Sequence, residues 1–365
     1  MMPTSVLVVG TGLLGTSVAL SLRDSDFDVE VWLHDENPDA SARAADMGAG
    51  TVGLPESDPD LVLVAVPPLV TGSVVAQWQR RYATSTFTDV ASVKAGPLED
   101  LLAAGGDPTR YVGGHPMAGR EVSGPAGARV DLFVDRVWAI TPLDGTDLDR
   151  VALVRGVAEN AGAVPVMLDP TTHDRAVALT SHAPQVVSSL LAARLAHADP
   201  SEVMVSGQGL RDVTRIAASD PELWTEIIAA NADQVLDVLD ELHDDLQTMR
   251  DALRHLGGAD GGTAGDLADI TYLLHQGNVG RARVPDKHGD RLAPEYSVVA
   301  VQIDDRPGEL GRLFAAAGEA EVNIEDVRID HALGRLVAVV ELLVRPEVAQ
   351  GLSDSLAAAG YRLRG

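Results

Sequence analysis

Residues 5–25, SVLVVGTGLLGTSVALSLRDS, decide the fold of the first half of the chain. The four apolar residues at positions 6–9 predict a strand that is buried on both faces. Gly10, Gly12 and Gly15 then form a G-x-G-x-x-G turn, and apolar residues recur at helical spacing after it. A strand, a glycine turn and a helix in this order are typical of the first unit of a doubly wound sheet that binds a dinucleotide.

The residues of this turn have distinct roles in the predicted cofactor site. Gly10 permits a tight turn, Gly12 lets the backbone approach a pyrophosphate, and Gly15 permits close packing of the helix on the strand. Asp35, which lies 20 residues after Gly15, would accept a hydrogen bond from a ribose 2′-hydroxyl and would repel a 2′-phosphate. We therefore expect NAD as the cofactor, in preference to NADP. The predicted cofactor-binding residues are Gly10, Thr11, Gly12, Leu13, Leu14, Gly15 and Asp35.

The alternation of strands and helices continues to about residue 167. Runs rich in apolar residues are expected to form further strands at 61–68, 86–92, 136–142 and 163–169. This alternation predicts an α/β Rossmann-type doubly wound domain with a parallel sheet over residues 1–168.

Residues 169–256 read as an all-α domain. Within it, residues 221–256 form a periodic run with few helix-breaking residues, and we expect one helix of about 35 residues there. A helix of that length is seldom covered by its own small domain, so we expect an all-α dimerisation domain and a homodimer.

The last part of the chain reads as a linker and a small domain. Residues 257–294 begin with the glycine-rich segment GGADGGTAGD and are expected to be a linker with a short helix. Residues 295–365 follow the order strand, helix, strand, strand, helix, strand, which predicts an α+β ferredoxin-like domain.

Composition limits the classes of function. The chain has 365 residues, and its 28 Lys and Arg against 54 Asp and Glu give a formal net charge of −26. This excess argues against nucleic acid and anionic membranes as partners, because both require a basic face. The absence of cysteine excludes disulfides, thiolate catalysis and cysteine-based zinc sites. We find no signal peptide, no apolar stretch of about 18 residues and no metal-ligand spacing, and therefore expect a cytoplasmic protein without a metal.

Polar residues follow the predicted strands where a nicotinamide would lie. Asp89, Ser92 and Lys94 come after one strand, and His115 comes further along the chain. The segment GGHPMAG, residues 113–119, is too poor in apolar residues for a core strand. We therefore expect His115 in a loop that its glycines and proline hold in place for chemistry.

The helical part adds further candidates. His182 and Gln185 lie in the segment SHAPQ. Arg211 and Arg215 are four residues apart and are expected on one helix face, where two guanidiniums would suit a substrate with carboxylates.

Five segments in order give the chain a specific resemblance: GTGLLG (10–15), TDVASVK (88–94), GGHPMAGREVSG (113–124), SHAPQ (181–185) and RDVTRIAASDPELW (211–224). Over nearly its whole length the sequence resembles the prephenate dehydrogenase family with a C-terminal ACT domain. The resemblance implies NAD-dependent oxidative decarboxylation of prephenate to 4-hydroxyphenylpyruvate in tyrosine biosynthesis. In that reaction a hydride leaves the ring carbon that bears the hydroxyl, and the ring becomes aromatic as its carboxylate leaves.

The resemblance also implies roles for single residues. His115 matches the histidine that hydrogen-bonds the ring hydroxyl and, as a neutral imidazole, accepts its proton. Ser92 matches a serine near the same hydroxyl. Arg215 matches an arginine that binds a substrate carboxylate, Arg211 a basic position, and His182 a histidine that lines the pocket.

Two of the expected substrate-binding residues have alternatives. Some family members have a histidine where this chain has Gln185, which cannot titrate near neutrality, so prephenate and arogenate stay open as substrates. Lys94 either binds substrate or only pairs with Asp89. Trp224 is expected to pack behind the pocket. The remaining histidines are expected to be structural or solvated, at positions 34, 173, 197, 243, 255, 275, 288 and 331.

In the C-terminal unit, the resemblance implies an amino-acid effector site, and we expect feedback inhibition by tyrosine. Its residues would be the loop DRPG and the start of the next strand: Asp305, Arg306, Pro307, Gly308, Asn323 and Ile324. The alternative is a unit that serves dimerisation only.

Two other functions remain as rivals. One is an arogenate dehydrogenase, which would give tyrosine directly, or another NAD-dependent dehydrogenase with an all-α second domain. The other is a non-catalytic sensor of NAD and an amino acid. The combination of His115, Ser92 and Arg215 argues against a sensor, because a sensor needs no proton acceptor at the nicotinamide.

Overall fold

The opening stretch of the chain folds as its sequence predicts. Strand β1 (Ser5–Val9) is followed by the glycine turn and helix α1 (Leu13–Arg23) in the computed structural model. The structure describes residues 2–120, 122, 124–258, 261–284, 296–331 and 337–364. Gly10 has a φ of +94°, a conformation that favours glycine, and this allows the sharp turn out of β1.

Five parallel strands form the first sheet, in the order β3-β2-β1-β4-β5. The other four strands are β2 (Glu30–His34), β3 (Thr51–Val52), β4 (Leu61–Val64) and β5 (Thr86–Asp89). Val6 pairs with Val31 on one side and with Leu61 on the other, so β1 lies at the centre. The strand order reverses direction next to β1, and such a reversal is where doubly wound sheets bind ligands.

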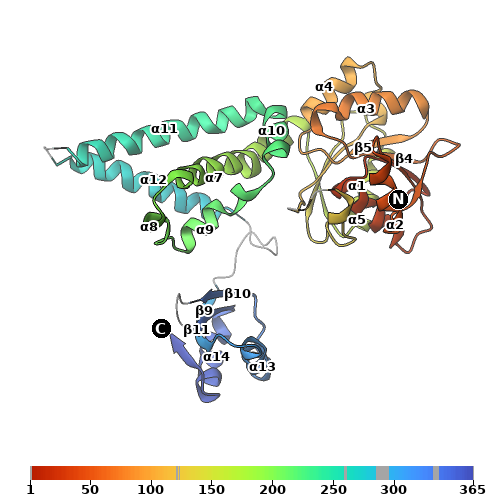
Figure 1. The fold of residues 1–365 in the computed structure, drawn as a ribbon. Coiled ribbons are helices and arrows are strands. Elements are labelled where there is room, and N and C mark those ends of the chain that lie inside the picture. The colour runs from red at the N-terminus through yellow and green to blue at the C-terminus, as the bar shows by residue number, and fades with distance from the viewer. Residues whose placement is uncertain are drawn as a thin grey trace. The chain divides into compact units, whose positions relative to one another are not determined.

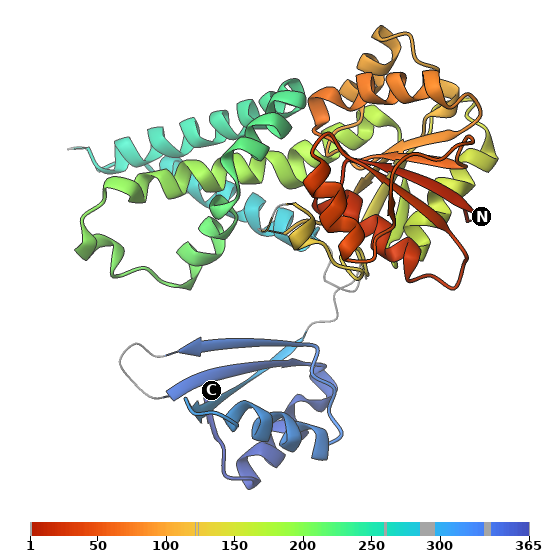
Figure 2. The same ribbon diagram turned by 45° about the vertical axis from the view of Figure 1, so that its right-hand side comes forward.

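The alternation of side chains along the strands builds two cores. Val6 and Val8 of β1 point into one core, while Leu7 and Val9 point into the other. Helices α1, α2 (Pro38–Asp46) and α5 (Leu148–Asn160) contribute to the first core. Helices α3 (Pro68–Arg81) and α4 (Ala95–Ala103) contribute to the second. The sheet is thus covered by helices on both faces (Figures 1 and 2).

A second sheet corrects the prediction of one parallel sheet. Strands β6 (Gly113–Pro116), β7 (Val137–Thr141) and β8 (Val164–Met167) form it, with β6 antiparallel to β7 and β8 parallel to β7. Short 3₁₀ turns η1 (Pro108–Arg110) and η2 (Pro125–Gly127) flank β6 along the chain. A parallel bridge between Phe87 and Tyr111 links the chain just before β6 to β5.

The prediction that His115 lies in a loop is wrong. Residues 113–116 are a strand in which all four residues are buried. The glycines make this possible, because a Cβ on Gly114 would lie 2.7 Å from the carbonyl oxygen of Asp89 and 3.1 Å from Nε1 of Trp138. The segment is poor in apolar side chains because its backbone is packed directly against its neighbours.

The chain from residue 170 to 256 is helical, as expected. Its elements are α6 (Pro170–Val177), the π-helical turn η3 (Ala178–His182), α7 (Ala183–Ala193), η4 (Arg194–His197), α8 (Pro200–Val203), α9 (Gln208–Thr214), η5 (Arg215–Ala218), α10 (Pro221–Ala230) and α11 (Ala232–Leu256). By length and composition the run Pro170–His197 could cross a membrane, contrary to the expectation from sequence. Core helices also pass that test, and 33% of its apolar window is buried within the chain.

The helix expected over residues 221–256 is two helices. It breaks at Asn231, where φ is −127° and ψ is 29°. The Asn231 side chain donates a hydrogen bond to the backbone carbonyl of Asp174 at 2.9 Å. Contacts with residues far away in the sequence therefore hold the break, and local helical periodicity does not reveal it.

The chain divides into two units, Met1–Gln247 and Thr248–Gly365, and the division falls within α11. The C-terminal unit contains α12 (Ala264–Ala282), β9 (Ser297–Asp304), α13 (Glu309–Glu319), β10 (Asp326–His331), β11 (Val337–Val344), α14 (Pro346–Ala358) and β12 (Arg362–Arg364). Helix α12 has 19 residues and is longer than the short helix expected in the linker.

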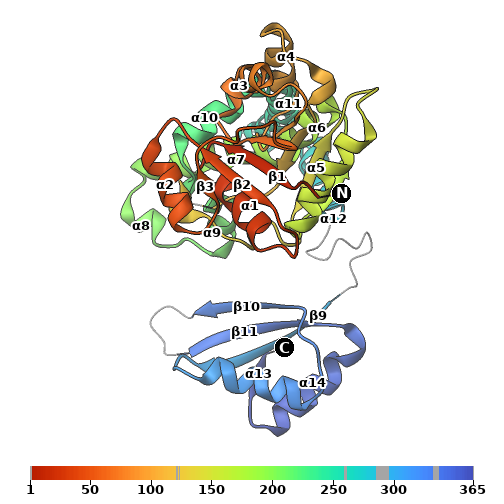
Figure 3. The ribbon, with the colours of Figure 1, turned by 90° about the vertical axis from the view of Figure 1, so that its right-hand side faces the viewer.

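The end of the C-terminal unit has the predicted order of strands and helices. Its antiparallel sheet has the order β10-β11-β9-β12, and α13 and α14 cover one face (Figure 3). Val299, Val301 and Ile303 of β9 face these helices and are buried with Leu313 and Leu352. The unit thus has a hydrophobic core of its own.

The glycine turn at residues 10–15 gives a test of how closely α1 packs on β1. A Cβ on Gly15 would overlap the carbonyl oxygen of Gly10, whereas a Cβ on Gly12 would have no atom within 4 Å. We expect Gly15→Ala to lower the free energy of unfolding by about 1–3 kcal/mol, as overpacking does, and Gly12→Ala to leave it nearly unchanged. Thermal and urea denaturation of the two variants would check this. Equal stability of both variants would contradict the packing described here.

Candidate active site

A cleft of about 890 Å³ lies at the carboxyl ends of β1, β4 and β5. Its lining comprises the start of α1 (residues 12–14), the segment after β5 (residues 90–92), the end of β6 and its following loop, and parts of η3 and α10. These elements come from both the sheet and the helical part of the N-terminal unit. The cleft therefore lies where a doubly wound sheet places its ligand.

The glycine turn forms one wall of this cleft and is shaped for a dinucleotide. Gly12, Leu13 and Leu14 line it at the N-terminus of α1, where backbone N–H groups and the helix dipole favour a phosphate. The space where Gly12 would carry a Cβ is open. The Asp35 carboxylate accepts hydrogen bonds from the backbone N–H of Thr11 at 2.6 Å and from its hydroxyl at 2.9 Å. These bonds fix the acidic residue beside the turn, so the residues present fit NAD.

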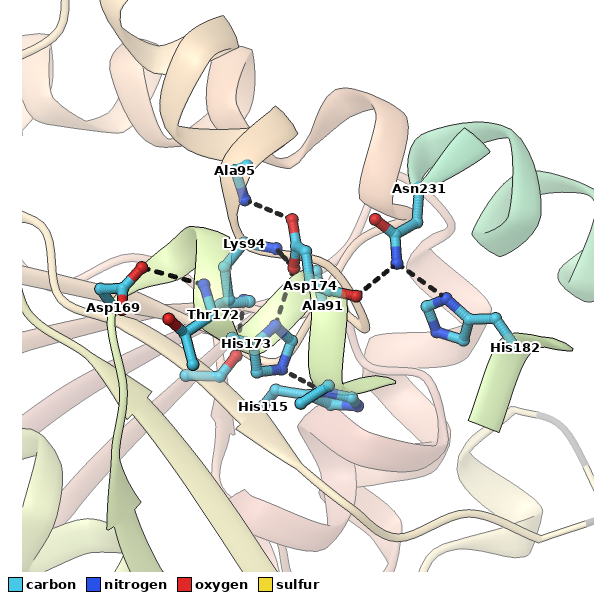
Figure 4. A network of polar contacts seen from close by, with 12 residues as sticks. Ala91, Lys94, Ala95, His115, Asp169, Thr172, His173, Asp174, His182 and Asn231 are labelled. Carbon is cyan, nitrogen blue, oxygen red and sulfur yellow. Dashed lines mark hydrogen bonds and ion pairs between the residues drawn. The ribbon is translucent and has the colours of Figure 1, made fainter. Parts of the chain in front are cut away.

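His115 projects from β6 and also lines the cleft. The residue is 7% exposed. Its Nδ1 lies 2.8 Å from Nε2 of His173, and the two rings meet edge to face (Figure 4). Its Nε2 has no hydrogen-bond partner among the residues that the structure describes. Burial lowers the pKa of His115 well below its usual value, and nearby His173, Lys94 and His182 lower it further. At neutral pH the ring is therefore uncharged and able to accept a proton.

His173 is one of the histidines expected to be structural or solvated, and the structure shows it buried and not solvated. Its ring is buried, and Nδ1 lies 2.7 Å from Oδ1 of Asp174. The Asp174 carboxylate also accepts hydrogen bonds at 2.8 Å from the backbone N–H groups of Lys94 and Ala95, at the start of α4. A side chain of α6 thus caps helix α4, and the same carboxylate holds His173 against His115.

His182 reaches the cleft from the π-helical turn η3. The wider turn shifts the register of side chains at the junction of α6 and α7, a feature often found at functional sites. The amide Nδ2 of Asn231 lies 3.1 Å from Nδ1 of His182 and donates to it, and Trp224 packs edge-on to the ring. Burial lowers the pKa of His182 to about 4, although the Asp174 charge raises it. His182 is therefore neutral at physiological pH.

Comparison with known proteins agrees with this arrangement. Residues 18–167 match the family model for the prephenate dehydrogenase nucleotide-binding domain, and residues 169–261 match that for its dimerization domain. A probable prephenate dehydrogenase, NovF of Streptomyces niveus, is 36% identical over 353 residues, covering 96% of this chain and 97% of the relative. The chain belongs to the prephenate dehydrogenase family.

Two solved structures are similar to this chain in fold. The prephenate dehydrogenase of A. aeolicus, in complex with hydroxyphenyl propionate and NAD+, is 29% identical, with a TM-score of 0.65. The match covers 76% of this chain and 97% of that one. The arogenate dehydrogenase of Synechocystis is 26% identical with a TM-score of 0.61, covering 76% of this chain and 99% of that one.

Of the family-implied residues, His115, Ser92 and His182 lie together in the cleft. Lys94 does not reach it: its ammonium is buried, pairs with the Asp89 carboxylate and donates to the Gly114 carbonyl oxygen at 2.7 Å. Of its two expected roles, the structure shows the ion pair. Burial lowers the pKa of Lys94, while the Asp89 charge opposes this.

The Asp89 carboxylate makes several of the contacts that hold β6 against β5. Besides Lys94, its carboxylate accepts hydrogen bonds from the Tyr111 hydroxyl at 2.9 Å and from the Gly114 backbone N–H at 3.0 Å. The two strands make no ladder with each other, so this buried carboxylate fixes the strand that carries His115.

Arg211, Arg215 and Gln185 do not line the cleft of this chain. Both arginines are exposed; α9 ends at Thr214, and Arg215, whose backbone stays in the right-handed helical region, begins the 3₁₀ turn η5. Gln185 is buried, and its amide donates to the Ser189 hydroxyl at 3.4 Å.

For several residues in or beside the cleft, the sequence did not predict their place there. Trp224 was expected behind the pocket but lines it, and Arg120 also lines it while donating to the Gly127 carbonyl oxygen at 2.7 Å. His173, Asp174 and Asn231 complete the polar network behind His115 and His182. The adjacent His and Asp at 173–174 were a signal for the first two, whereas Asn231 had none beyond being a polar residue in a helical run.

The neutral state of His182 predicts a pH dependence of stability. The unfolded chain binds a proton at this residue below its ordinary pKa of 6.5, whereas the folded chain binds one only near pH 4. The free energy of unfolding should therefore fall as pH falls from 6.5 to 4, and should fall less in His182→Gln. Urea denaturation of both proteins across this range measures it. Parallel stability curves would show that His182 does not carry this effect.

Proposed function

We propose that this chain catalyses the NAD-dependent oxidative decarboxylation of prephenate to 4-hydroxyphenylpyruvate, with His115 as the proton acceptor. The observation that carries this proposal is the position of His115: a neutral, buried imidazole whose Nε2 is free of partners among the described residues, in a cleft that also contains the start of α1. Family membership supplies the reaction class, since the matched relatives bear the name prephenate dehydrogenase.

The reaction needs a group that takes and returns one proton. Bound NAD supplies the acceptor for the hydride that leaves the ring carbon bearing the hydroxyl. His115 Nε2 accepts the hydroxyl proton as that carbon becomes a carbonyl. The bond to the ring carboxylate then breaks, its electron pair makes the ring aromatic, and carbon dioxide leaves. His115 returns its proton to the resulting phenolate oxygen, so the reaction has no net proton.

Neighbouring residues are assigned supporting roles in this proposal. Ser92 lines the cleft after β5, and the role proposed for its hydroxyl is a hydrogen bond to the same ring oxygen. His182 lines the substrate end next to Trp224. We keep Arg211 and Arg215 as proposed carboxylate ligands on the strength of the family resemblance, although neither lines the cleft of this chain. Arg120 is added as a third cation, because it lines the cleft itself.

Asp35 underlies the preference for NAD in the proposal. Its carboxylate is held beside the turn by Thr11 and also accepts a hydrogen bond from the Asn37 backbone N–H at 2.8 Å. A 2′-phosphate would bring a second negative charge to this fixed one. The carboxylate therefore supports a ribose with a free 2′-hydroxyl.

We also propose that the chain works as a homodimer through its helical part. The second matched family model describes a dimerization domain. Large apolar side chains are exposed along α7 and α11, among them Leu190 at 61%, Leu236 at 55% and Leu246 at 54%. A second copy would remove this surface from water. A cytoplasmic location stays a prediction from composition.

The function is tested by the absorbance of NADH with four pairs: prephenate or arogenate, each with NAD or NADP. We expect NADH from prephenate and NAD, and no turnover in His115→Asn, which should still bind NAD as tightly as the wild type. Activity with arogenate alone would keep the mechanism and change the substrate, a result that Gln185 leaves open. If none of the four pairs gives reduced cofactor although NAD binds, the result would favour the non-catalytic sensor of NAD and an amino acid.

The C-terminal unit carries a separate proposal, that it is an ACT domain which binds tyrosine as an inhibitor. Support comes from its strand and helix order and from the exposed loop before α13. In that loop Gly308 has a φ of +93°, and the space beside it is open. Asp305, Arg306, Pro307 and Gly308 form the loop. Asn323 and Ile324 precede β10, which begins at Asp326, so Asn323 does not begin that strand as expected.

Tyrosine at millimolar concentration should therefore slow NADH formation and raise the melting temperature, because a ligand that binds only the folded state stabilises it. Gly308→Val should weaken both effects, since valine strongly disfavours a positive φ and would fill the open space. The control is the same titration with an amino acid of different side chain, such as lysine. No change in rate or melting temperature would remove the effector role and leave a structural unit.

A further inference from the structure

We propose that His173 and Asp174 are positioning residues that hold His115 in the one neutral tautomer able to accept the substrate proton. The inference rests on the proposed function and extends it to two residues that do not line the cleft. The observation behind it is an unbroken line of contacts from a helix end to His115: the start of α4, Asp174, His173 and His115 (Figure 4).

The direction of each hydrogen bond follows from the fixed end of this line. Asp174 accepts two backbone N–H bonds, so it acts as an anionic acceptor that the fold holds in place. His173 must then carry its proton on Nδ1 to donate to Asp174, which leaves its Nε2 as an acceptor. His115 must in turn carry its proton on Nδ1 to donate to His173. Its Nε2 is thereby left unprotonated, toward the cleft.

The same line disperses the charge that forms during the reaction. When His115 accepts the hydroxyl proton at Nε2, it becomes a cation in a buried place where burial opposes that charge. Its Nδ1 proton can then shift to Nε2 of His173, which places the positive charge next to the Asp174 carboxylate. Both protons move back when His115 returns its proton to the phenolate. No atom is gained or lost along the line, and Asp174 stays ionised throughout.

Other charged groups around the histidine pair come from several elements. Lys94, just before α4, is a cation whose charge acts on His115, and Asp89 at the end of β5 pairs with it. Tyr111 donates to Asp89, and His182 of η3 is neutral. Asn231 donates to the Asp174 backbone carbonyl and so helps to fix α6 in place. Of the carboxylates among these groups, Asp174 is the one that contacts a histidine ring.

Kinetics of His173→Gln and Asp174→Asn test the proposal in the full-length enzyme. We expect kcat to fall by about 10²-fold in each, as loss of general base assistance does, while KM for NAD stays near the wild-type value. In Asp174→Asn the acid limb of the pH profile of kcat/KM should also move to lower pH, because the lost carboxylate no longer favours the protonated pair. A role in packing alone would not move that limb.

A matched control exists in the C-terminal unit. His255 makes the same kind of contact, with its Nδ1 2.9 Å from Oδ1 of Asp266, and has no place in the proposed machinery. We expect His255→Gln to leave kcat and the pH profile unchanged. If His173→Gln and Asp174→Asn lower kcat no more than this control and leave the acid limb in place, the proposal is overturned.

Nitrogen-15 NMR of the wild type tests the tautomers without any variant that could misfold. With ¹⁵N-labelled histidine, His173 and His115 should both show protonated Nδ1 and unprotonated Nε2 at neutral pH. A proton on Nε2 of either ring would overturn the proposal. A wild type that makes no NADH from prephenate or arogenate would overturn the proposed function and this inference with it. An active wild type with the wrong tautomers would overturn this inference alone.

Discussion

The site depends on one carboxylate held by a helix end. Asp174 lies on α6 and accepts two backbone N–H bonds from the start of α4. It therefore joins the helical part of the N-terminal unit to a helix that packs on the first sheet. A buried carboxylate is costly unless it is hydrogen-bonded, and this one is satisfied by two N–H groups, by the helix dipole and by His173. Once it is fixed, the orientation of the imidazoles beyond it follows.

A second buried carboxylate, Asp89, solves a different problem. The strand that carries His115 begins with two glycines and has little side-chain surface to bury. Burial of apolar side chains therefore contributes little to holding this strand against its neighbours. Asp89 replaces that contribution with bonds to Lys94, Tyr111 and the Gly114 backbone. The scarcity of apolar residues in this segment thus allows an imidazole to line the same cleft as the glycine turn. Asp89 bonds to the backbone of the strand, and His173 contacts the ring.

Much of the fold was predictable because it follows from the spacing of apolar residues and glycines along short segments. The β1 strand, its glycine turn, α1 and the order of elements in the C-terminal unit all follow from short-range patterns. The break at Asn231 and the burial of 113–116 were missed because they depend on partners far away in the sequence, such as Asp174 and Trp138. The same reason applies to the site: motifs located His115 and Ser92, whereas the contact with His173 joins two residues 58 positions apart and exists only in the folded chain.

The proposed mechanism requires one contact above all, between His115 and the ring oxygen of the substrate. A crystal structure of this chain with NAD and hydroxyphenyl propionate, the ligand pair of the A. aeolicus enzyme, measures it directly. We expect Nε2 of His115 to lie about 2.6–3.2 Å from the ring hydroxyl oxygen, while Nδ1 keeps its contact with His173. A hydroxyl oxygen bound elsewhere in the cleft, with His115 facing no ligand atom, would contradict it.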